Sequence, residues 1–254
     1  MSNIKMFMEQ DGFIVLKNAL SMEMVESYRK MIGNYFGVSD NYDEGHERHK
    51  ADAFNTPELF ELHKLFQLKK FTKPMQELTD NKLMYLHHGD IHLNFTAVNL
   101  HEDVQERGTD TSDYSWQEGH PNNTEPYKCY TVAIYLQDHD DGSGLSVMKG
   151  SHKLSFTNMI DSDVQKLNKP VMNLHTNAGD IVVFDCRLLH KGNKDSRGNR
   201  RAIYFRMGQG ENIHSENHVI GAVTRQQKEN GKSIKSYKIH STLQKVLDDN
   251  SIKY

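Results

Sequence analysis

Two histidines and one aspartate are the residues of this chain best suited to bind a redox-active metal. His101 and Asp103 stand one residue apart, directly after the strand-like apolar run Ile91–Leu100. In extended backbone, side chains at positions i and i+2 lie on the same side, so this imidazole and this carboxylate face one point. His190 follows a second strand-like run, Ile181–Asp185, and a returning strand would bring it beside the other two.

This combination of ligands suits ferrous iron. Two histidines and a carboxylate occupy one face of an octahedral Fe(II) and leave three positions open. A 2-oxo acid can take two of these positions and dioxygen the third, whereas a closed four-ligand zinc site has none to offer. We therefore interpret His101, Asp103 and His190 as ligands of Fe(II).

The His-x-Asp spacing occurs a second time, at His88-Gly89-Asp90. Because glycine and aspartate are common turn residues and this copy precedes the long apolar run, we interpret it as a turn. The pair His101 and Asp103 is the preferred metal-binding copy.

An arginine is needed to hold the distal carboxylate of a 2-oxo acid, since its planar guanidinium pairs with a carboxylate through two hydrogen bonds. Arg200 and Arg201 begin an apolar run that alternates in character. Alternation puts Arg200 with Ala202 and Tyr204 on one face, and Arg201 on the other. Only one of the two can point inward, and periodicity does not say which.

The elements that must position these residues fall into two regions. In the first, Asp11–Leu16 predicts a turn and a short strand, and a helix is expected between a Ser21 cap and Gly37. A second helix is expected to begin at Thr56-Pro57, and another short one after Pro74.

From about residue 83 the pattern is that of short strands without intervening helices, which indicates a sandwich or jelly roll. The fold class expected is mainly β with flanking helices (α+β). After Glu211 the chain is polar and lysine-rich, with one helical stretch near Leu243–Leu247, and is expected to be solvated. The strands are expected at Leu83–Leu86, Ile91–Leu100, Tyr130–Gln137, Leu145–Met148, Val171–Leu174, Ile181–Asp185 and Ala202–Met207.

Composition narrows the functional classes. A length of 254 residues favours a single domain, 1–254, and a net charge of −3 gives no field for nucleic acid or an anionic membrane. No segment has the length of a membrane span or the character of a signal peptide, so a cytoplasmic protein is expected. Cys129 and Cys186 lie in apolar runs and are interpreted as core residues.

The chain resembles the phytanoyl-CoA dioxygenase family over roughly residues 8–208, with the tail from 211 to 254 outside the likeness. The resemblance rests on Asp11-Gly12-Phe13-Ile14-Val15-Leu16, His101-Glu102-Asp103, Ala133-Ile134-Tyr135-Leu136-Gln137-Asp138, Lys149-Gly150-Ser151-His152, and Gly179-Asp180 through His190 to Arg200-Arg201-Ala202-Ile203. It implies a double-stranded β-helix (a cupin-like jelly roll), Fe(II), and 2-oxoglutarate as co-substrate.

By the same resemblance, the metal ligands are His101, Asp103 and His190. The family's arginine precedes one residue and then a small one, so it falls on Arg200, with Arg201 in reserve. The implied reaction is hydroxylation of an aliphatic carbon with release of succinate and CO2.

Alternatives to this reaction remain open at this point. The same metal site can serve desaturation, epimerisation or cyclisation, and the same fold can be a non-catalytic binding module. The partners expected are O2 and a small polar metabolite, recognised by loop 104–127, segment 38–53 and the tail.

Overall fold

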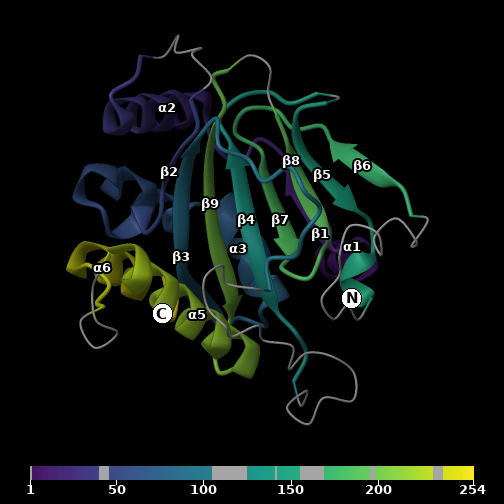
Figure 1. Ribbon diagram of the computed structural model, residues 1–254. Helices are drawn as coiled ribbons and strands as arrows, with labels where there is room; N and C mark the ends of the chain where they lie inside the picture. The colour runs from purple at the N-terminus through teal and green to yellow at the C-terminus, as the bar shows by residue number, and fades with distance from the viewer. Residues whose placement is uncertain are drawn as a thin grey trace.

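The strands form two antiparallel sheets that face each other (Figure 1). The computed structural model describes residues 2–39, 46–104, 125–140, 142–154, 169–194, 198–230 and 237–254, with side chains up to residue 225 in the helix that ends at 230. The larger sheet has the order β1-β7-β4-β9-β3-β2 and the smaller has the order β6-β5-β8. The strands are β1 Phe13–Leu16, β2 Arg48–Lys50, β3 Leu83–Leu93, β4 Cys129–Tyr135, β5 Gly144–Met148, β6 Val171–Leu174, β7 Ile181–Asp185, β8 His190–Asn193 and β9 Arg201–Gln209.

Residues 97–103 run beside β8 and extend the smaller sheet by a fourth extended segment. His101 and His190 form an antiparallel bridge, and the amide of Gly192 donates to the carbonyl of Ala97 at 2.7 Å. Residues of both sheets pack together in one cluster between them, which is the arrangement of a jelly roll. The predicted double-stranded β-helix, mainly β with flanking helices, is confirmed.

Side-chain alternation divides the large sheet into two faces. On β9, Ile203 and Phe205 belong to the cluster packed under the helices, whereas Ala202 and Tyr204 belong to the cluster between the sheets. The β4 strand repeats this division, with Ile134 on the helix side. Period-two geometry therefore decides which residues of each strand can reach the interior of the jelly roll.

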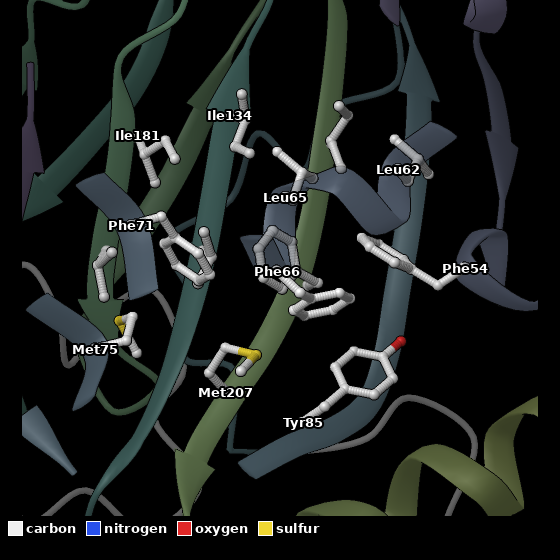
Figure 2. Packing of buried hydrophobic residues seen from close by; sticks show 14 of the residues in the cluster. Phe54, Leu62, Leu65, Phe66, Phe71, Met75, Tyr85, Ile134, Ile181 and Met207 are labelled. Atoms are coloured by element: carbon white, nitrogen blue, oxygen red, sulfur yellow. The ribbon is translucent and has the colours of Figure 1, made fainter. Parts of the chain in front are cut away.

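Four helices pack on the outer face of the large sheet: α1 Asn3–Asp11, α2 Met22–Phe36, α3 Lys69–Leu78 and α6 Ser241–Asp249. Helix α5 Ile213–Asn230 packs on the opposite face, where Ser215 Oγ lies 3.6 Å from Cys129 Sγ. The 3₁₀ segments are Ala53–Asn55, Pro57–Gln67 and Ser151–Lys153. Figure 2 shows the rings of Phe54, Phe66 and Tyr85 packed between the 3₁₀ segments and the strands. The expected limits of α2 are confirmed: the Ser21 hydroxyl accepts from the amide of Met24, and Gly37 has φ of 67°.

The helix start predicted at Thr56-Pro57 is confirmed, although the segment 57–67 is a 3₁₀ helix and Thr56 makes no side-chain cap bond. The short helix expected after Pro74 is wrong, because Pro74 lies inside α3. Phe71, Met75 and Leu78 are buried at helical spacing on the sheet, so tertiary packing holds the helix across a proline that breaks one backbone hydrogen bond.

The interpretation of His88-Gly89-Asp90 as a turn is also wrong. These residues lie within β3, where Gly89 pairs with Phe205 and the register shifts between Tyr85 and Gly89. A Cβ atom on Gly89 would lie 2.3 Å from Phe54 Cδ2, so the glycine permits close packing and does not mark a chain reversal. The predicted strand Ile91–Leu100 correspondingly ends at Leu93.

The C-terminal extension is folded onto the core and is not simply a solvated tail. Helix α5, which the polar pattern did not predict, packs against β3 (Figure 1). Leu243 and Leu247 of α6 and Ile252 are buried in the cluster beneath the helices. Lys253 bridges to Met84 at the start of β3.

Candidate metal centre and cavity

Backbone pairing brings together the three residues predicted to bind metal. The amide of His101 donates to the carbonyl of His190 at 2.9 Å, and the amide of His190 returns a bond to His101 at 3.0 Å. Two residues that exchange both backbone hydrogen bonds in this way form a hydrogen-bonded pair, as in antiparallel strands. The amide of Asp103 donates to the carbonyl of Cys186 at 2.7 Å, which continues the pairing.

The side chains of this triad converge on one point. His101 Nε2 lies 3.9 Å from Asp103 Oδ1, and His190 Nε2 lies 3.8 Å from Asp103 Oδ2. The three ligand atoms all lie within 4.8 Å of one another. Ligands held about 2.1 Å from a metal on one octahedral face are about 3 Å apart, so these atoms need to move together by only about 1 Å.

Both histidines present the nitrogen that a metal requires. Nδ1 of His101 bonds to the carbonyl of Asn99 at 2.8 Å, and Nδ1 of His190 bonds to the carbonyl of Leu188 at 2.9 Å. A carbonyl can only accept, so each Nδ1 carries the proton and each Nε2 keeps its lone pair for the centre. Burial lowers the pKa of His190 to about 4, which keeps this imidazole neutral at pH 7.

Asp103 is held as a carboxylate by its neighbours. Burial acts to raise its pKa, but Arg206, with the two histidines and Thr131, outweighs burial and lowers the pKa far below its ordinary value. The Thr131 hydroxyl donates to Oδ2 at 2.7 Å, and Arg206 Nη2 lies 3.4 Å from Oδ1. Sequence reasoning missed Thr131 and Arg206, although alternation along β9 places Arg206 on the face of Arg200.

The triad lines a cavity of about 290 Å³. This volume is close to the lower limit for small-molecule sites, about 300–1,000 Å³. Leu145 and Phe184 form the apolar part of the wall. Thr96 packs directly on Gly192: a Cβ atom on Gly192 would lie 1.7 Å from the hydroxyl oxygen of Thr96. The cavity therefore fits a small co-substrate at the triad with a limited space beside it.

The two candidate arginines point to opposite faces of the sheet. Arg200 Nη2 donates to the Tyr204 hydroxyl at 2.7 Å, and its guanidinium lies 5.3 Å from the centre of the Tyr135 ring, between the sheets. Arg200 is not itself in the cavity wall, but Tyr204 is. Arg201 extends under the helices and donates to the carbonyl of Ser39 at 2.8 Å. Of the two, Arg200 is the one whose guanidinium lies between the sheets.

The second His-x-Asp copy lines the same cavity. Among the described residues, His49, Asp90 and His92 form the one other group whose ligand atoms lie within 4.8 Å of one another. Here Arg225 Nη2 donates to both oxygens of Asp90, at 2.9 and 2.8 Å, so a metal ion would have to displace a guanidinium. At the triad, by contrast, Arg206 Nη2 lies 3.4 Å from one oxygen of Asp103.

Parts of the segments expected to select the substrate, 105–124 and 40–45, lie outside the described residues. The described part of segment 38–53 brings His49 to the cavity wall. No helix in the described part of the chain is long and apolar enough to cross a membrane.

Comparison with known proteins identifies the family and the fold. Residues 8–202 match the family model described as phytanoyl-CoA dioxygenase (PhyH). No similar protein was found among curated sequences.

Three solved structures illustrate the likeness. HygX from Streptomyces hygroscopicus with nickel and 2-oxoglutarate is 16% identical, with 83% of this chain and 88% of that chain covered and a TM-score of 0.61. The epimerase SnoN from nogalamycin biosynthesis is 14% identical, with 81% and 82% covered and a TM-score of 0.62. EctD from S. alaskensis with 2-oxoglutarate and 5-hydroxyectoine is 16% identical, with 82% and 76% covered and a TM-score of 0.60. At these identities the likeness establishes the fold.

Proposed function

Since the chain belongs to the phytanoyl-CoA dioxygenase family, we propose that it is an Fe(II)- and 2-oxoglutarate-dependent dioxygenase with its metal on His101, Asp103 and His190. The observation that carries this proposal is the convergence of two Nε2 lone pairs and one ionised carboxylate within 4.8 Å in a cavity wall. HygX and EctD, which share the fold, were crystallised with 2-oxoglutarate.

Bound iron would activate dioxygen together with 2-oxoglutarate, releasing succinate and CO2 as the substrate is oxidised. The residues of the chain have the tasks of binding and orientation. Arg200, buried beside Tyr204, is proposed to pair with the distal carboxylate of 2-oxoglutarate. Thr131 orients the Asp103 carboxylate, and Arg206 keeps it ionised.

The reaction outcome proposed is hydroxylation of an aliphatic carbon in a small polar metabolite. The small cavity with polar walls supports a compact substrate. SnoN is described as an epimerase, which supports epimerisation as an alternative outcome at the same centre. Desaturation and cyclisation are further alternatives, which would need only a different placement of the substrate. The whole chain is proposed to act as one domain in the cytoplasm, where reducing conditions keep iron ferrous.

Metal and co-substrate binding tests the proposal without a known substrate. One Ni(II) or Fe(II) per chain should bind anaerobically, and 2-oxoglutarate should bind only to the metal-loaded protein. With Fe(II) and O2, slow succinate formation should follow, and His101→Ala and Asp103→Ala should abolish both metal binding and succinate. Gln substitution of the exposed Lys64 is the control that should change neither. Tight binding of metal and 2-oxoglutarate without succinate, under any candidate substrate, would indicate a binding module instead.

A further inference from the structure

The cavity has a second polar wall built from elements far apart in the chain. Asp90 and His88 come from β3, His49 from β2, and Arg225 from α5, which packs beside β3 (Figure 1). All four residues line the cavity. Helix α5 lies beyond residue 202, where the family match ends, so this wall is partly a feature of the C-terminal extension.

Every contact recorded on Asp90 comes from a donor-bearing side chain. Arg225 Nη2 lies 2.9 and 2.8 Å from its two oxygens, His49 Nε2 lies 3.1 Å from Oδ2, and His88 Nε2 lies 3.3 Å from the same atom. Burial acts to raise the Asp90 pKa, but His88, His49 and Arg225 outweigh it and hold the pKa well below its ordinary value. Three of these contacts fall on Oδ2 and one on Oδ1, so most of the acceptor capacity of this carboxylate is used within the protein.

The donor side chains around Asp90, the guanidinium of Arg225 above all, are therefore what this wall offers to a ligand. One buried carboxylate is shared among a guanidinium and two imidazoles, and a guanidinium recognises carboxylate or phosphate oxygens in its plane. His49 has 29% of its side chain exposed and Arg225 has 12%, whereas Asp90 has 6%. The donor side chains thus lie nearer to the open space than the acid does.

Two further polar atoms in the same cavity lack a hydrogen-bond partner. Nδ1 of His92 and the hydroxyl of Thr96 are buried and unpaired among the described residues. The His92 ring lies 4.9 Å from that of His49 and 4.7 Å from that of Tyr204, so it connects the second wall with the Arg200 region. Buried polar atoms without partners cost free energy unless a ligand or water satisfies them. A polar ligand bound in this space would be able to satisfy them.

We propose that Arg225, held by Asp90 and flanked by His49 and His88, forms a recognition subsite for an anionic group of the primary substrate, a carboxylate or a phosphate. Helix α5 is then part of the active site, and Asp90 is a positioning residue that fixes the guanidinium. This inference rests on the proposed function, because it takes the cavity beside the metal triad as the place where the substrate binds.

The experiment uses the full chain loaded with Ni(II) and saturated with 2-oxoglutarate, so that Arg200 is occupied. Acetate, inorganic phosphate and methylammonium are titrated separately by calorimetry or by NMR line shifts. The unmodified protein should bind acetate or phosphate and should not bind methylammonium. The better of the two anions shows which source of the anionic group is favoured.

Arg225→Gln should weaken anion binding at least tenfold without changing the affinity for Ni(II) or 2-oxoglutarate. Two matched controls should leave all affinities unchanged: Thr224→Ala, one residue away on α5, and Lys64→Gln, which removes a positive charge from an exposed ion pair. Thermal unfolding of each variant shows whether α5 stays docked.

Equal anion binding by Arg225→Gln and the unmodified protein overturns the inference, and a loss of thermal stability alone would show that Arg225 only fastens α5 to β3. Methylammonium binding that disappears in Asp90→Asn also overturns it, because the acid would then be the recognition group. Failure of Ni(II) or 2-oxoglutarate to bind the unmodified protein refutes the proposed function instead. The two failures are thus distinguishable.

Discussion

Replacing Arg200 by glutamine gives the sharpest test of how 2-oxoglutarate is held. Arg200 is 1% exposed, so solvent screens its charge very little. Removing one partner of a buried, hydrogen-bonded charge pair costs about 2–5 kcal/mol. At about 1.4 kcal/mol per tenfold change, this range corresponds to a loss of affinity between about 30-fold and a few thousand-fold.

The structure places the expected loss in the lower part of that range. Without ligand, Arg200 already donates to the Tyr204 hydroxyl at 2.7 Å and to the carbonyl of Phe95. When Arg200 binds the distal carboxylate of 2-oxoglutarate, it gives up part of these hydrogen bonds. The net gain in free energy is therefore smaller than for a guanidinium that had no partner before. We expect Arg200→Gln to weaken 2-oxoglutarate binding about 30- to 300-fold, and Arg200→Lys to weaken it less.

Calorimetric titration of 2-oxoglutarate into the Ni(II)-loaded protein measures this effect. Arg201→Gln is the matched control, since Arg201 is equally buried but extends to the other face of the sheet toward Ser39. It should lower the unfolding temperature and leave the affinity within about twofold, well under 1 kcal/mol. Unchanged affinity in Arg200→Gln, or a large loss confined to Arg201→Gln, would refute the assignment of the distal-carboxylate site.

Three other perturbations follow from the same structure. Thr131→Ala removes the hydroxyl that donates to Asp103 at 2.7 Å, so metal affinity should fall about 10- to 100-fold, while Thr131→Ser should keep it; a competitive metal titration measures both. Gly192→Ala would place a Cβ atom 1.7 Å from the Thr96 hydroxyl oxygen, so overpacking should destabilise the fold by about 1–3 kcal/mol in chemical unfolding, and Thr96→Ala in the same chain should recover part of this loss. Burial, partly opposed by hydrogen bonds from Asn55 and Tyr237, raises the pKa of Asp52 to about 6. The folded state therefore binds the proton of Asp52 more tightly than the unfolded state does. The stability that this proton contributes is lost as pH rises from about 4 to about 6. Asp52→Asn, which tolerates the φ of 56° at this position, should therefore stabilise the protein by about 1–3 kcal/mol at pH 8 and very little at pH 4; an equal gain at both pH values would contradict this reasoning.

The alternation of apolar residues made the β architecture predictable. Strand geometry repeats every two residues, so a half-buried strand such as β9 records its two faces in the sequence itself. The common face expected for Ala202 and Tyr204 agrees with the cluster between the sheets, and Ile203 and Phe205 lie in the cluster on the other side. The cap and stop residues of α2, Ser21 and Gly37, are equally local signals, and the helix begins and ends where they predict.

Features that depend on contacts between distant segments were not predictable in this way. Pro74 stays inside α3 because the helix is pressed onto the sheet, and His88-Gly89-Asp90 stays in β3 because β9 pairs with it. Helix α5 has a polar sequence, so its docking on β3 left no clear periodic signal. In each case the local conformation is decided by the free energy of packing against distant segments, which local sequence propensity does not reflect.

The sequence by itself determined that two His-x-Asp copies, a later histidine and an arginine pair were available for iron and a 2-oxo acid. Only the tertiary structure decided how they are used, because pairing between strands remote in the chain places each side chain. The reciprocal bridge between His101 and His190 gathers one set of ligand atoms with open lone pairs. In the other copy, Arg225 of α5 donates to both oxygens of the Asp90 carboxylate.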